Sequence, residues 1–412
     1  MKTIYKVMIT LVIILYMVAC EKSPVDPGNN KIPVDKSTEE LIKSDNEFGI
    51  DLYKKLLAYQ EDGSNVILSP LSAAFALAMT YNGADGTTKT AMEESLKKEG
   101  FTTEEINEIY KNLMNGLMSV DNNVTLNIAN SIWYRDNFYV EQEFINTNQN
   151  YYDAEVRALD FGNTSAKDII NSWVEEKTND KIKDIIQQIS PNTVMFLINA
   201  IYFNGIWTYE FDKESTTDGD FYLADGSIIQ VPTMYLEEEL MYSENELFSS
   251  VELFYGAGNY SMIILLPDHG KSTDDIVDQL TSEDWESWNN SYTEEEVVVG
   301  LPKFKFEFED SLNNPLIDMG MGVAFNPDEA DFSKINPGQD IFISMVKQKA
   351  YIDVNEKGTE AAAATVVEME LTAMPGGKKY FTVNRPFMFV IKEKDTNAII
   401  FIGRVMQPEY KE

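Results

Sequence analysis

The sequence predicts one large domain of mixed α and β structure that spans residues 45–412. Apolar residues recur at helical spacing in the first part of the chain, whereas segments rich in β-branched and aromatic residues dominate the last third. No fixed-period repeat or low-complexity linker divides the body, and 44% hydrophobic residues supply a large core. This order of elements favours a large central sheet with helices packed on it.

Two helices and their starts are the clearest local predictions. Apolar residues at helical spacing predict a helix in residues 46–60, and AAFALAMTYNGA predicts a second helix that is apolar nearly all round and therefore buried. Ser69 and Ser72 stand at the start of the second helix, where hydroxyl groups cap free backbone amides. A further helix is expected over residues 166–186, with a break near Asn179.

Two segments are predicted to be strands that are buried on both faces. Residues 124–136 (VTLNIANSIWYRD) and 193–207 (TVMFLINAIYFNGIW) are rich in β-branched and aromatic residues and too apolar for the edge of a sheet. The second segment carries Asn199, a polar residue that is expected to be buried. Shorter alternating segments with glycine-containing turns follow, as in GDFYLADGSIIQVPTMY.

Residues 1–19 have the features of a secretory signal. Two lysines precede an apolar run that is too short, and too one-sided in its flanks, for a good membrane span. The run ends in Met-Val-Ala-Cys, which resembles the bacterial lipobox, so Cys20 is expected to become the lipidated first residue of the mature protein. Residues 20–44 are polar, with three prolines and a glycine, and are expected to form a flexible lipidated tether.

The composition argues against several classes of function. A formal net charge of −35 repels phosphate backbones, so a nucleic-acid partner is not expected. His269 is the only histidine and lies in a predicted turn, and Cys20, the only cysteine, is consumed by lipidation. A Cys-His pair and a metal site built on histidines or cysteines are thus excluded, and a Ser-His-Asp triad would depend on His269 alone. We expect no enzyme activity, no cofactor and no metal.

The stretch Glu356–Thr372, EKGTEAAAATVVEMELT, permits two interpretations. Its four alanines, and a length sufficient for three turns, are compatible with a surface helix. As a strand, residues 359–370 separate into one small or apolar face and a second face that carries all three acids. Such a strand could slide between two others and bury its apolar face. The pattern alone leaves helix and strand open.

Several stretches resemble the serpin family of protease inhibitors, and they occur in the family's order. NVILSPLSAAFALAMTYNGADGTT, INSWVEEKTNDKI, TVMFLINAIYFNGIW, LPKFKFEFE and MGMGVAFNPDEADFSKI are similar to family segments, and FTVNRPFMFVI is close to the C-terminal signature. The resemblance covers about residues 45–408. It implies a serpin fold of three β-sheets and about nine helices, with an exposed reactive loop at about residues 356–378 that enters the central sheet as a new strand once a protease has cut it.

The resemblance also implies roles for residues of the reactive loop. The hinge from which the cut loop enters the sheet comprises Glu356, Gly358, Thr359, Ala361 and Ala363. Family spacing from Glu356 places the scissile bond between Thr372 and Ala373, with Leu371 and Met374 as alternates.

A second set of residues is implied to lie where the sheet must open. It comprises Ser69, Ser72, Asn199, Trp207 and Gln348. Gln348 stands where family members commonly place a histidine that bonds the asparagine matched by Asn199. Glutamine supplies both a donor and an acceptor without titrating, so we expect the hydrogen bonds to be kept and any pH sensitivity to be lost.

These features together predict a bacterial serpin that is lipid-anchored in the cell envelope, at the outer membrane or cell surface, and inhibits proteases as a suicide substrate. Because no Lys or Arg lies between Gly358 and Gly377, the expected partners are elastase-like and subtilisin-like serine proteases, with papain-like cysteine proteases as a further class. The protein is expected to be a monomer. The alternative is a non-inhibitory binding protein or adhesin with the same fold, because Glu368 and Glu370 could make the loop a poor substrate for many proteases.

Overall fold

The computed structural model describes residues 31–338, 340–359 and 377–410, and the structural findings concern these residues. Residues 1–19, Cys20 and the first part of the expected tether lie outside them. So do Ala361 and Ala363 of the hinge and the candidate scissile-bond residues Leu371, Thr372, Ala373 and Met374.

The described residues form ten α-helices, in agreement with the expected number of about nine. They are α1 (Lys36–Leu57), α2 (Pro70–Tyr81), α3 (Gly86–Ser95), α4 (Thr103–Ser119), α5 (Gln142–Tyr152), α6 (Ser165–Lys177), α7 (Thr273–Gln279), α8 (Ser282–Asn289), α9 (Asn313–Leu316) and α10 (Gly322–Phe325). The last two are single turns joined by a π-helical segment, Ile317–Met321.

The first helix begins before the expected end of the tether. α1 starts at Lys36, where the Asp35 side chain accepts a hydrogen bond from the backbone N–H of Thr38 at 2.8 Å and caps the helix. Leu41 and Ile42 of α1 are buried. Residues 36–44 therefore belong to the folded domain, and the predicted boundary at residue 45 is too late.

The helix expected over residues 166–186 ends near its middle. α6 stops at Lys177, and Asn179 adopts a left-handed backbone conformation with a φ of 51°. The break was therefore predicted at the correct place, but no helix resumes after it. Instead Ile182 is buried with Trp173 of α6 in a separate hydrophobic cluster.

The described strands form two hydrogen-bonded sheets. The smaller sheet has six strands in the order β10 (Phe304–Ser311), β11 (Lys347–Asn355), β12 (Gly358–Thr359), β4 (Met195–Ile206), β2 (Val124–Arg135) and β3 (Glu155–Leu159). The larger sheet has nine strands, in the order β1 (Val66–Leu68), β15 (Ile399–Val405), β14 (Phe387–Glu393), β8 (Tyr260–Pro267), β7 (Phe248–Tyr255), β6 (Ile228–Glu244), β9 (Thr293–Pro302) and β13 (Lys379–Thr382), with β5 (Thr217–Tyr222) also paired to β6.

The resemblance implied three sheets, and the long strand β6 accounts for the difference. β6 pairs with β9 over Thr233–Tyr242 and with β7 over Met241–Glu244. Hydrogen bonding therefore continues through β6 from the strands on the β7 side to those on the β9 side, and the two groups of strands count as one sheet. The mixed α and β fold class itself is confirmed.

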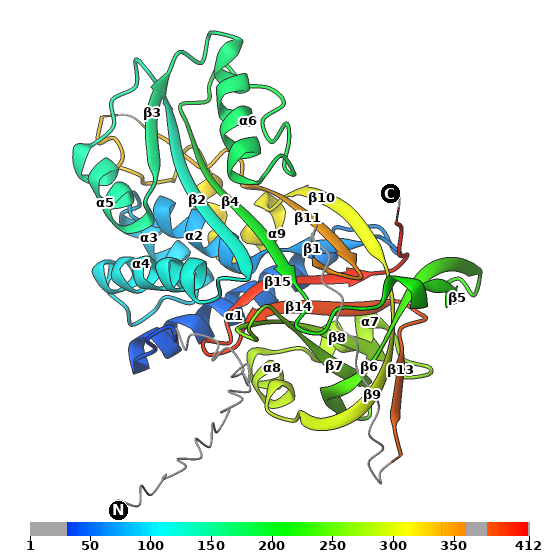
Figure 1. Cartoon of the computed structure of the whole chain (residues 1–412). Coiled ribbons are helices and arrows are strands. Elements are labelled where there is room, and N and C mark those ends of the chain that lie inside the picture. Colours follow the sequence, from blue (N-terminus) through cyan, green and yellow to red (C-terminus); the bar gives the residue numbers. More distant parts are fainter. Residues whose placement is uncertain (1–30, 339, 360–376, 411–412) are drawn as a thin grey trace, which may run out of the picture. The chain divides into compact units, whose positions relative to one another are not determined.

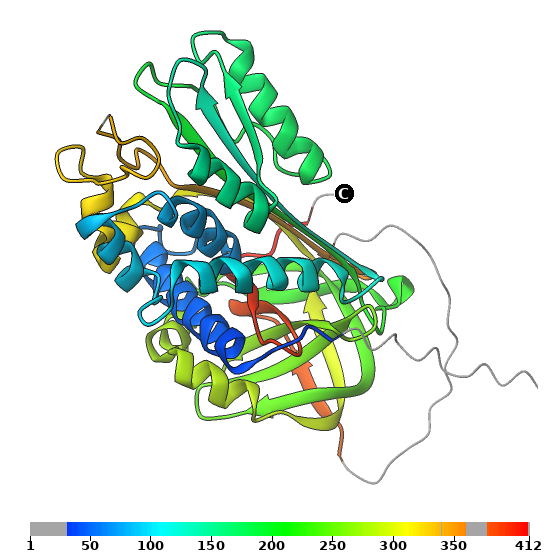
Figure 2. The same cartoon turned by 90° about the vertical axis from the view of Figure 1, so that its left-hand side faces the viewer.

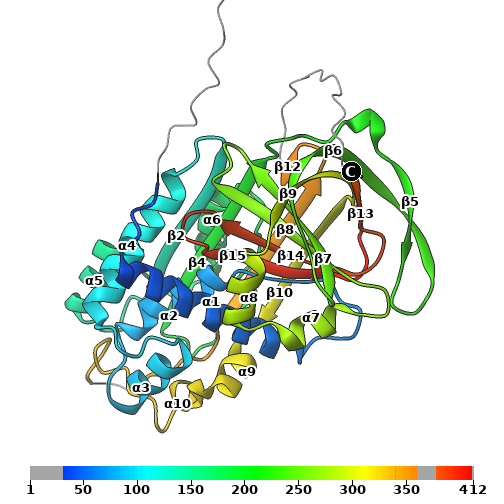
Figure 3. The same ribbon diagram turned by 90° about the horizontal axis from the view of Figure 1, so that it is seen from below.

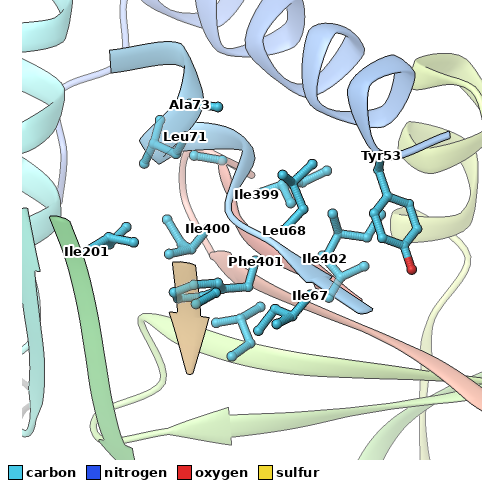
Figure 4. Close-up of a cluster of buried hydrophobic side chains, with 14 of the residues drawn as sticks. Tyr53, Ile67, Leu68, Leu71, Ala73, Ile201, Ile399, Ile400, Phe401 and Ile402 are labelled. Atoms are coloured by element: carbon cyan, nitrogen blue, oxygen red, sulfur yellow. The ribbon is translucent and has the colours of Figure 1, made fainter. Parts of the chain in front are cut away.

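Helix α2 lies between the two sheets and explains why its sequence is apolar nearly all round. Leu71 and Ala73 of α2 are buried in one cluster with Ile201 of β4 and with Ile400 of β15 (Figure 4). Every residue of α2 except Ala76 is buried. The prediction of a buried helix is confirmed, and α2 connects the smaller sheet to the larger one.

Helix α6 covers one face of the smaller sheet over β2 and β4 (Figures 1 and 2). The ring of Trp173 in α6 meets that of Trp133 in β2 edge to face, with 5.9 Å between centroids. Figure 3 shows α1 to α5 grouped on one side and β5 to β9 with β13 on the other. Across the part of the chain that the structure describes, no helix is both long and apolar enough to cross a membrane.

Candidate functional site

A tight hairpin places the first hinge residues between two strands of the smaller sheet. β11 ends at Asn355, the chain turns, and β12, which is Gly358 and Thr359, returns antiparallel to β11. On its other side β12 pairs antiparallel with the end of β4, where Thr359 lies opposite Gly205. Two backbone ladders therefore hold the start of the hinge between β11 and β4.

Further along the sheet, β4 and β11 do not pair with each other in the described residues. β4 pairs with β2 and β12, and β11 pairs with β10 and β12. Gly358 and Thr359 are thus the only described residues that pair through the backbone with both strands. Since backbone N–H and C=O groups need partners, an added strand between β4 and β11 would find donors and acceptors on both sides.

Gly358 occupies a position that no other residue fits. Its φ is 154°, which L-residues rarely adopt. A Cβ atom built there would lie 2.0 Å from the carbonyl oxygen of Gly205. The hairpin can approach β4 this closely only because residue 358 has no side chain.

Thr359 is buried, and its side chain contacts Tyr255, one member of a stacked aromatic pair. Its hydroxyl lies 2.6 Å from the hydroxyl of Tyr255, at the end of β7. The Tyr255 ring stacks on Trp207, with 4.3 Å between centroids and 14° between planes. The hydroxyl of Thr359 therefore has a buried partner in Tyr255, and a charged side chain at this position would have to be buried beside that tyrosine.

Trp207 also holds the hairpin turn through two hydrogen bonds. Its ring N–H donates to the carbonyl oxygen of Asn355 at 2.9 Å, and its backbone N–H donates to that of Lys357 at 2.8 Å. Trp207 is 2% exposed, so both bonds are shielded from water. The residue implied to lie at the opening of the sheet thus fixes the turn that precedes the hinge.

Glu356, the first residue of the turn, forms a buried ion pair with Lys303. The Lys303 ammonium lies 2.9 Å and 3.1 Å from the two carboxylate oxygens, and Thr216 donates a hydrogen bond to the carboxylate at 3.0 Å. Burial opposes ionisation of Glu356, but the hydrogen bonds from Lys303 and Thr216 outweigh it and lower the pKa of the carboxyl. The turn is therefore anchored by a charged group that stays ionised at neutral pH.

The four remaining sheet-opening residues form a second site. Gln348 of β11 makes both of its hydrogen bonds to the backbone of Ser69: its carbonyl oxygen accepts from the Ser69 N–H at 2.8 Å and its amide donates to the Ser69 C=O at 3.0 Å. Ser69 caps α2 by accepting from the N–H of Ser72 at 3.3 Å. Gln348 thereby connects β11 to the start of α2.

Asn199 is held by other partners than the resemblance implied. The Ser72 hydroxyl donates to its side-chain oxygen at 2.5 Å, and its amide donates to Asn130 of β2 at 2.7 Å. Gln348 and Asn199 thus share the start of α2 as a common neighbour, and the implied bond between these two positions is replaced by bonds to Ser69 and Ser72.

The implied sheet-opening residues therefore divide into two groups along β4. Asn199 and Trp207 are eight positions apart in the sequence. At about 3.3 Å per residue this separation is about 26 Å. The first group joins both central strands to α2, whereas Trp207 belongs to the hinge.

Three residues of the site were not predicted from the sequence. Tyr255 and Thr216 lie in segments whose patterns suggest only strands and turns. Lys303 could have been found from the sequence, because it stands between apolar residues in Gly-Leu-Pro-Lys-Phe, and a lysine buried among them requires an acidic partner. In the structure Lys303 is 7% exposed.

His269 is exposed in the turn after β8, as predicted. No group of His, Cys, Asp and Glu side chains that could hold a metal ion occurs within residues 31–338, 340–359 and 377–410.

Comparisons with known proteins agree with this architecture. The family model described as Serpin (serine protease inhibitor) matches residues 43–408. An uncharacterized serpin-like protein of Methanosarcina acetivorans is 37% identical over 385 residues, which cover 91% of this chain and 90% of that protein. The crystal structure of the thermophilic serpin tengpin in its native state is 35% identical with a TM-score of 0.83, covering 91% of this chain and 95% of that one. Human thyroxine-binding globulin, solved in complex with thyroxine, is 29% identical with a TM-score of 0.82, and the match covers 91% of this chain and 100% of that one.

Proposed function

The chain belongs to the serpin family, whose members act on target proteases, and from this we propose that it inhibits proteases as a suicide substrate. The observation that carries the proposal is the position of β12. Gly358 and Thr359 pair with β11 on one side and β4 on the other. The start of the hinge thus already lies in the register that an inserted loop would continue.

In the proposed mechanism the protease attacks the bond between Thr372 and Ala373. The serine oxygen of the protease bonds to the Thr372 carbonyl carbon, and the bond from this carbon to the Ala373 nitrogen breaks. The released amine of Ala373 takes up the proton that the serine hydroxyl has lost. The loop up to Thr372 then remains esterified to the protease. Inhibition requires insertion to be faster than hydrolysis of this ester.

Insertion would carry the protease a long way from the site of cleavage. From Gly358 to Thr372 the chain has 14 steps (372 − 358). At about 3.3 Å per residue, an inserted strand of this length spans about 46 Å. This distance is comparable to the diameter of a protease, so the ester would be moved from one end of the sheet towards the other.

The composition of the hinge supports inhibition. The residues that follow Thr359 include four consecutive alanines, Ala361–Ala364. Small side chains meet little steric resistance between β4 and β11, so insertion is expected to be rapid. The absence of Lys and Arg between Gly358 and Gly377 favours targets with small or medium apolar pockets, namely elastase-like, subtilisin-like and papain-like proteases.

We further propose that the protein acts as a monomer at the cell envelope, anchored by a lipid on Cys20. The support is the lipobox-like sequence that ends in the only cysteine. Replacing Cys20→Ser should release the protein from the membrane fraction, with the processed wild type as control. If both forms fractionate alike, the lipid anchor is wrong, whereas the inhibitory proposal is unaffected.

The proposed inhibition is tested by incubating the purified protein with elastase-like, subtilisin-like and trypsin-like proteases. An SDS-stable covalent complex with the first two classes is expected, and mass analysis of the released peptide should place the cut at Thr372–Ala373. The Thr359→Arg variant serves as the control, because it should be cut without forming the complex. Cleavage of the wild type without complex, and without a gain in thermal stability, would contradict inhibition.

The second candidate function is that of a non-inhibitory binding protein. The observation that favours it is the likeness to thyroxine-binding globulin, a protein of the same fold that was solved with a small ligand. Under this alternative the loop would be cut as an ordinary substrate, and the small hinge residues would have no role. The same incubation distinguishes the two candidates.

A further inference from the structure

The C-terminal segment of the chain lies beside the ion pair that anchors the hinge. After β15 ends at Val405, Pro408 is buried. The Glu409 carbonyl oxygen accepts a hydrogen bond from the backbone N–H of Lys305 at 2.8 Å. This bond fixes the segment along the start of β10, two residues from Lys303 in sequence.

Tyr410 covers the ammonium group of Lys303. The Lys303 Nζ atom lies 4.2 Å from the centre of the Tyr410 ring, which is within cation–π range. The same ammonium group binds the Glu356 carboxylate at 2.9 Å. The ammonium group of Lys303 therefore contacts both an aromatic ring and a carboxylate.

The surroundings of the Tyr410 hydroxyl keep the phenol neutral. Burial, together with the negative charge of Asp353, raises the pKa of Tyr410 to about 12. Asp353 lies on β11, three residues before Glu356, and Lys305 is 3.4 Å from its carboxylate. Tyr410 thus contacts both the ion pair and the strand from which the hinge leaves.

We propose that Tyr410 is a positioning residue of the hinge, which holds Lys303 on Glu356 and so fixes the turn from which the loop enters the sheet. This inference rests on the proposed inhibitory function. The turn at Glu356 and Lys357 determines where β12 starts, and β12 pairs with β4 and β11. An inserted loop would continue from β12 in the same register. A loosened turn lets β12 leave this register, which delays insertion.

The test uses the purified full-length protein and three variants of matched kind. Tyr410→Ala removes the ring, whereas Tyr410→Phe keeps the ring and removes only the hydroxyl. Tyr139→Ala is the control, because Tyr139 is 60% exposed and is distant in sequence from the hinge. Thermal unfolding is measured for each variant to check that it is folded.

The first measurement is the stoichiometry of inhibition, the number of inhibitor molecules consumed per protease trapped. We expect Tyr410→Ala to raise it by about fivefold, the effect of losing a partly buried cation–π contact. Tyr410→Phe and Tyr139→Ala should stay near the wild-type value. If Tyr410→Phe behaves as Tyr410→Ala does, the contact between ring and ammonium is not the cause and the inference is wrong.

The second measurement does not need a target protease. A synthetic peptide with the sequence of residues 359–372 competes for the space between β4 and β11, and its uptake is followed on native gels. With a loosened turn, β12 leaves its place between β4 and β11 more readily, so Tyr410→Ala should take up the peptide about fivefold faster. If no protease forms a complex with the wild type but this acceleration is observed, the inhibitory proposal fails and the positioning role stands.

A double-mutant cycle separates positioning from a general structural role. In the background Lys303→Met, Tyr410→Ala should have no further effect on peptide uptake, because the ring then has no ammonium group to hold. Equal effects of Tyr410→Ala in both backgrounds would overturn the inference, as would unchanged stoichiometry and unchanged peptide uptake in the folded Tyr410→Ala variant.

Discussion

The hydroxyl of Thr359 and the hydroxyl of Tyr255 lie 2.6 Å apart in a buried hydrogen bond between the hinge and the larger sheet. The two residues are 104 positions apart in the sequence. Thr359 also pairs through its backbone with β4 and β11, so it contacts both sheets at once. The position of the hinge is therefore sensitive to what stands at residue 359.

Replacing Thr359→Arg should convert the inhibitor into a substrate. The guanidinium group would have to be buried beside Tyr255, at a cost of several kcal/mol, so β12 would not form and insertion would be slowed. The expected result is cleavage by elastase-like proteases with almost no SDS-stable complex. Full inhibition by this variant would show that insertion at residue 359 is not part of the mechanism.

Thr359→Val is the matched control for size. Valine has nearly the same shape as threonine but leaves the Tyr255 hydroxyl without its partner, which costs about 1–2 kcal/mol. We expect this variant to remain an inhibitor, with a moderately raised stoichiometry of inhibition. A variant as defective as Thr359→Arg would indicate that the hydroxyl, rather than the size of the residue, is decisive.

Replacing Glu356→Gln should destabilise the turn before the hinge. It leaves the Lys303 ammonium buried without a counter-charge, for which a loss of about 3 kcal/mol in the free energy of unfolding is expected. Denaturant unfolding measures this loss. Adding Lys303→Met should restore part of the stability, because the unpaired charge is then removed. No recovery in the double variant would contradict the ion pair as the source of the effect.

The same ion pair makes a defined prediction for pH. The folded-state pKa of Glu356 is lowered from its ordinary value of 4.5, so its contribution to stability is complete above that value and is lost as the pH falls through the lower folded-state value. The stability difference between wild type and Glu356→Gln should therefore be constant between about pH 6 and about pH 8 and shrink below about pH 4.5. A difference that shrinks already near neutral pH would contradict this sign.

Much of the fold follows from local pattern, because elements buried on both faces have unmistakable composition. The predicted strands 124–136 and 193–207 agree with β2 and β4 to within two residues at each end. The continuous apolar surface of α2 likewise indicates contact on two sides. The start of α1 was missed, although Asp35, with Glu39 in the first turn, is a recognisable helix start.

The contacts of the site could be predicted only in part, because they join segments far apart in the chain. Family resemblance identified Thr359 and Glu356 but not what holds them. Lys303 is 53 residues from Glu356, and the Tyr410 ring comes from the end of the chain. Nothing in the local pattern around Tyr255 or Tyr410 distinguishes these tyrosines from others, and three-dimensional packing alone brings them to the hinge.

Replacing Gly358→Ala should prevent the hinge from pairing with β4. The added methyl group would lie 2.0 Å from the carbonyl oxygen of Gly205, and the φ of 154° is unfavourable for alanine. We expect slower insertion, measured as a raised stoichiometry of inhibition. Gly377→Ala is the control, because a Cβ atom at Gly377 meets nothing within 4 Å. Equal behaviour of the two variants would contradict the close approach as the cause.

Replacing Gln348→His should introduce a pH dependence that is not expected of the natural protein. Gln348 accepts a hydrogen bond from the Ser69 N–H and donates one to the Ser69 C=O, and it does neither by titrating. A neutral histidine can also accept and donate, but its protonated form cannot accept from the Ser69 N–H. Burial and this lost bond lower the pKa of such a histidine, so its stabilising contacts are present above the pKa and lost as the pH falls through it.

The rate of inhibition by the wild type should vary little between about pH 5.5 and about pH 7.5 once the protease's own titration is subtracted, whereas the rate of inhibition by the Gln348→His variant should change over this range. The stability of the variant, followed by thermal unfolding, should fall towards the acid side, while that of the wild type should not show this step. A break in the wild-type rate that belongs to the inhibitor would show that some other group titrates where β4 and β11 separate.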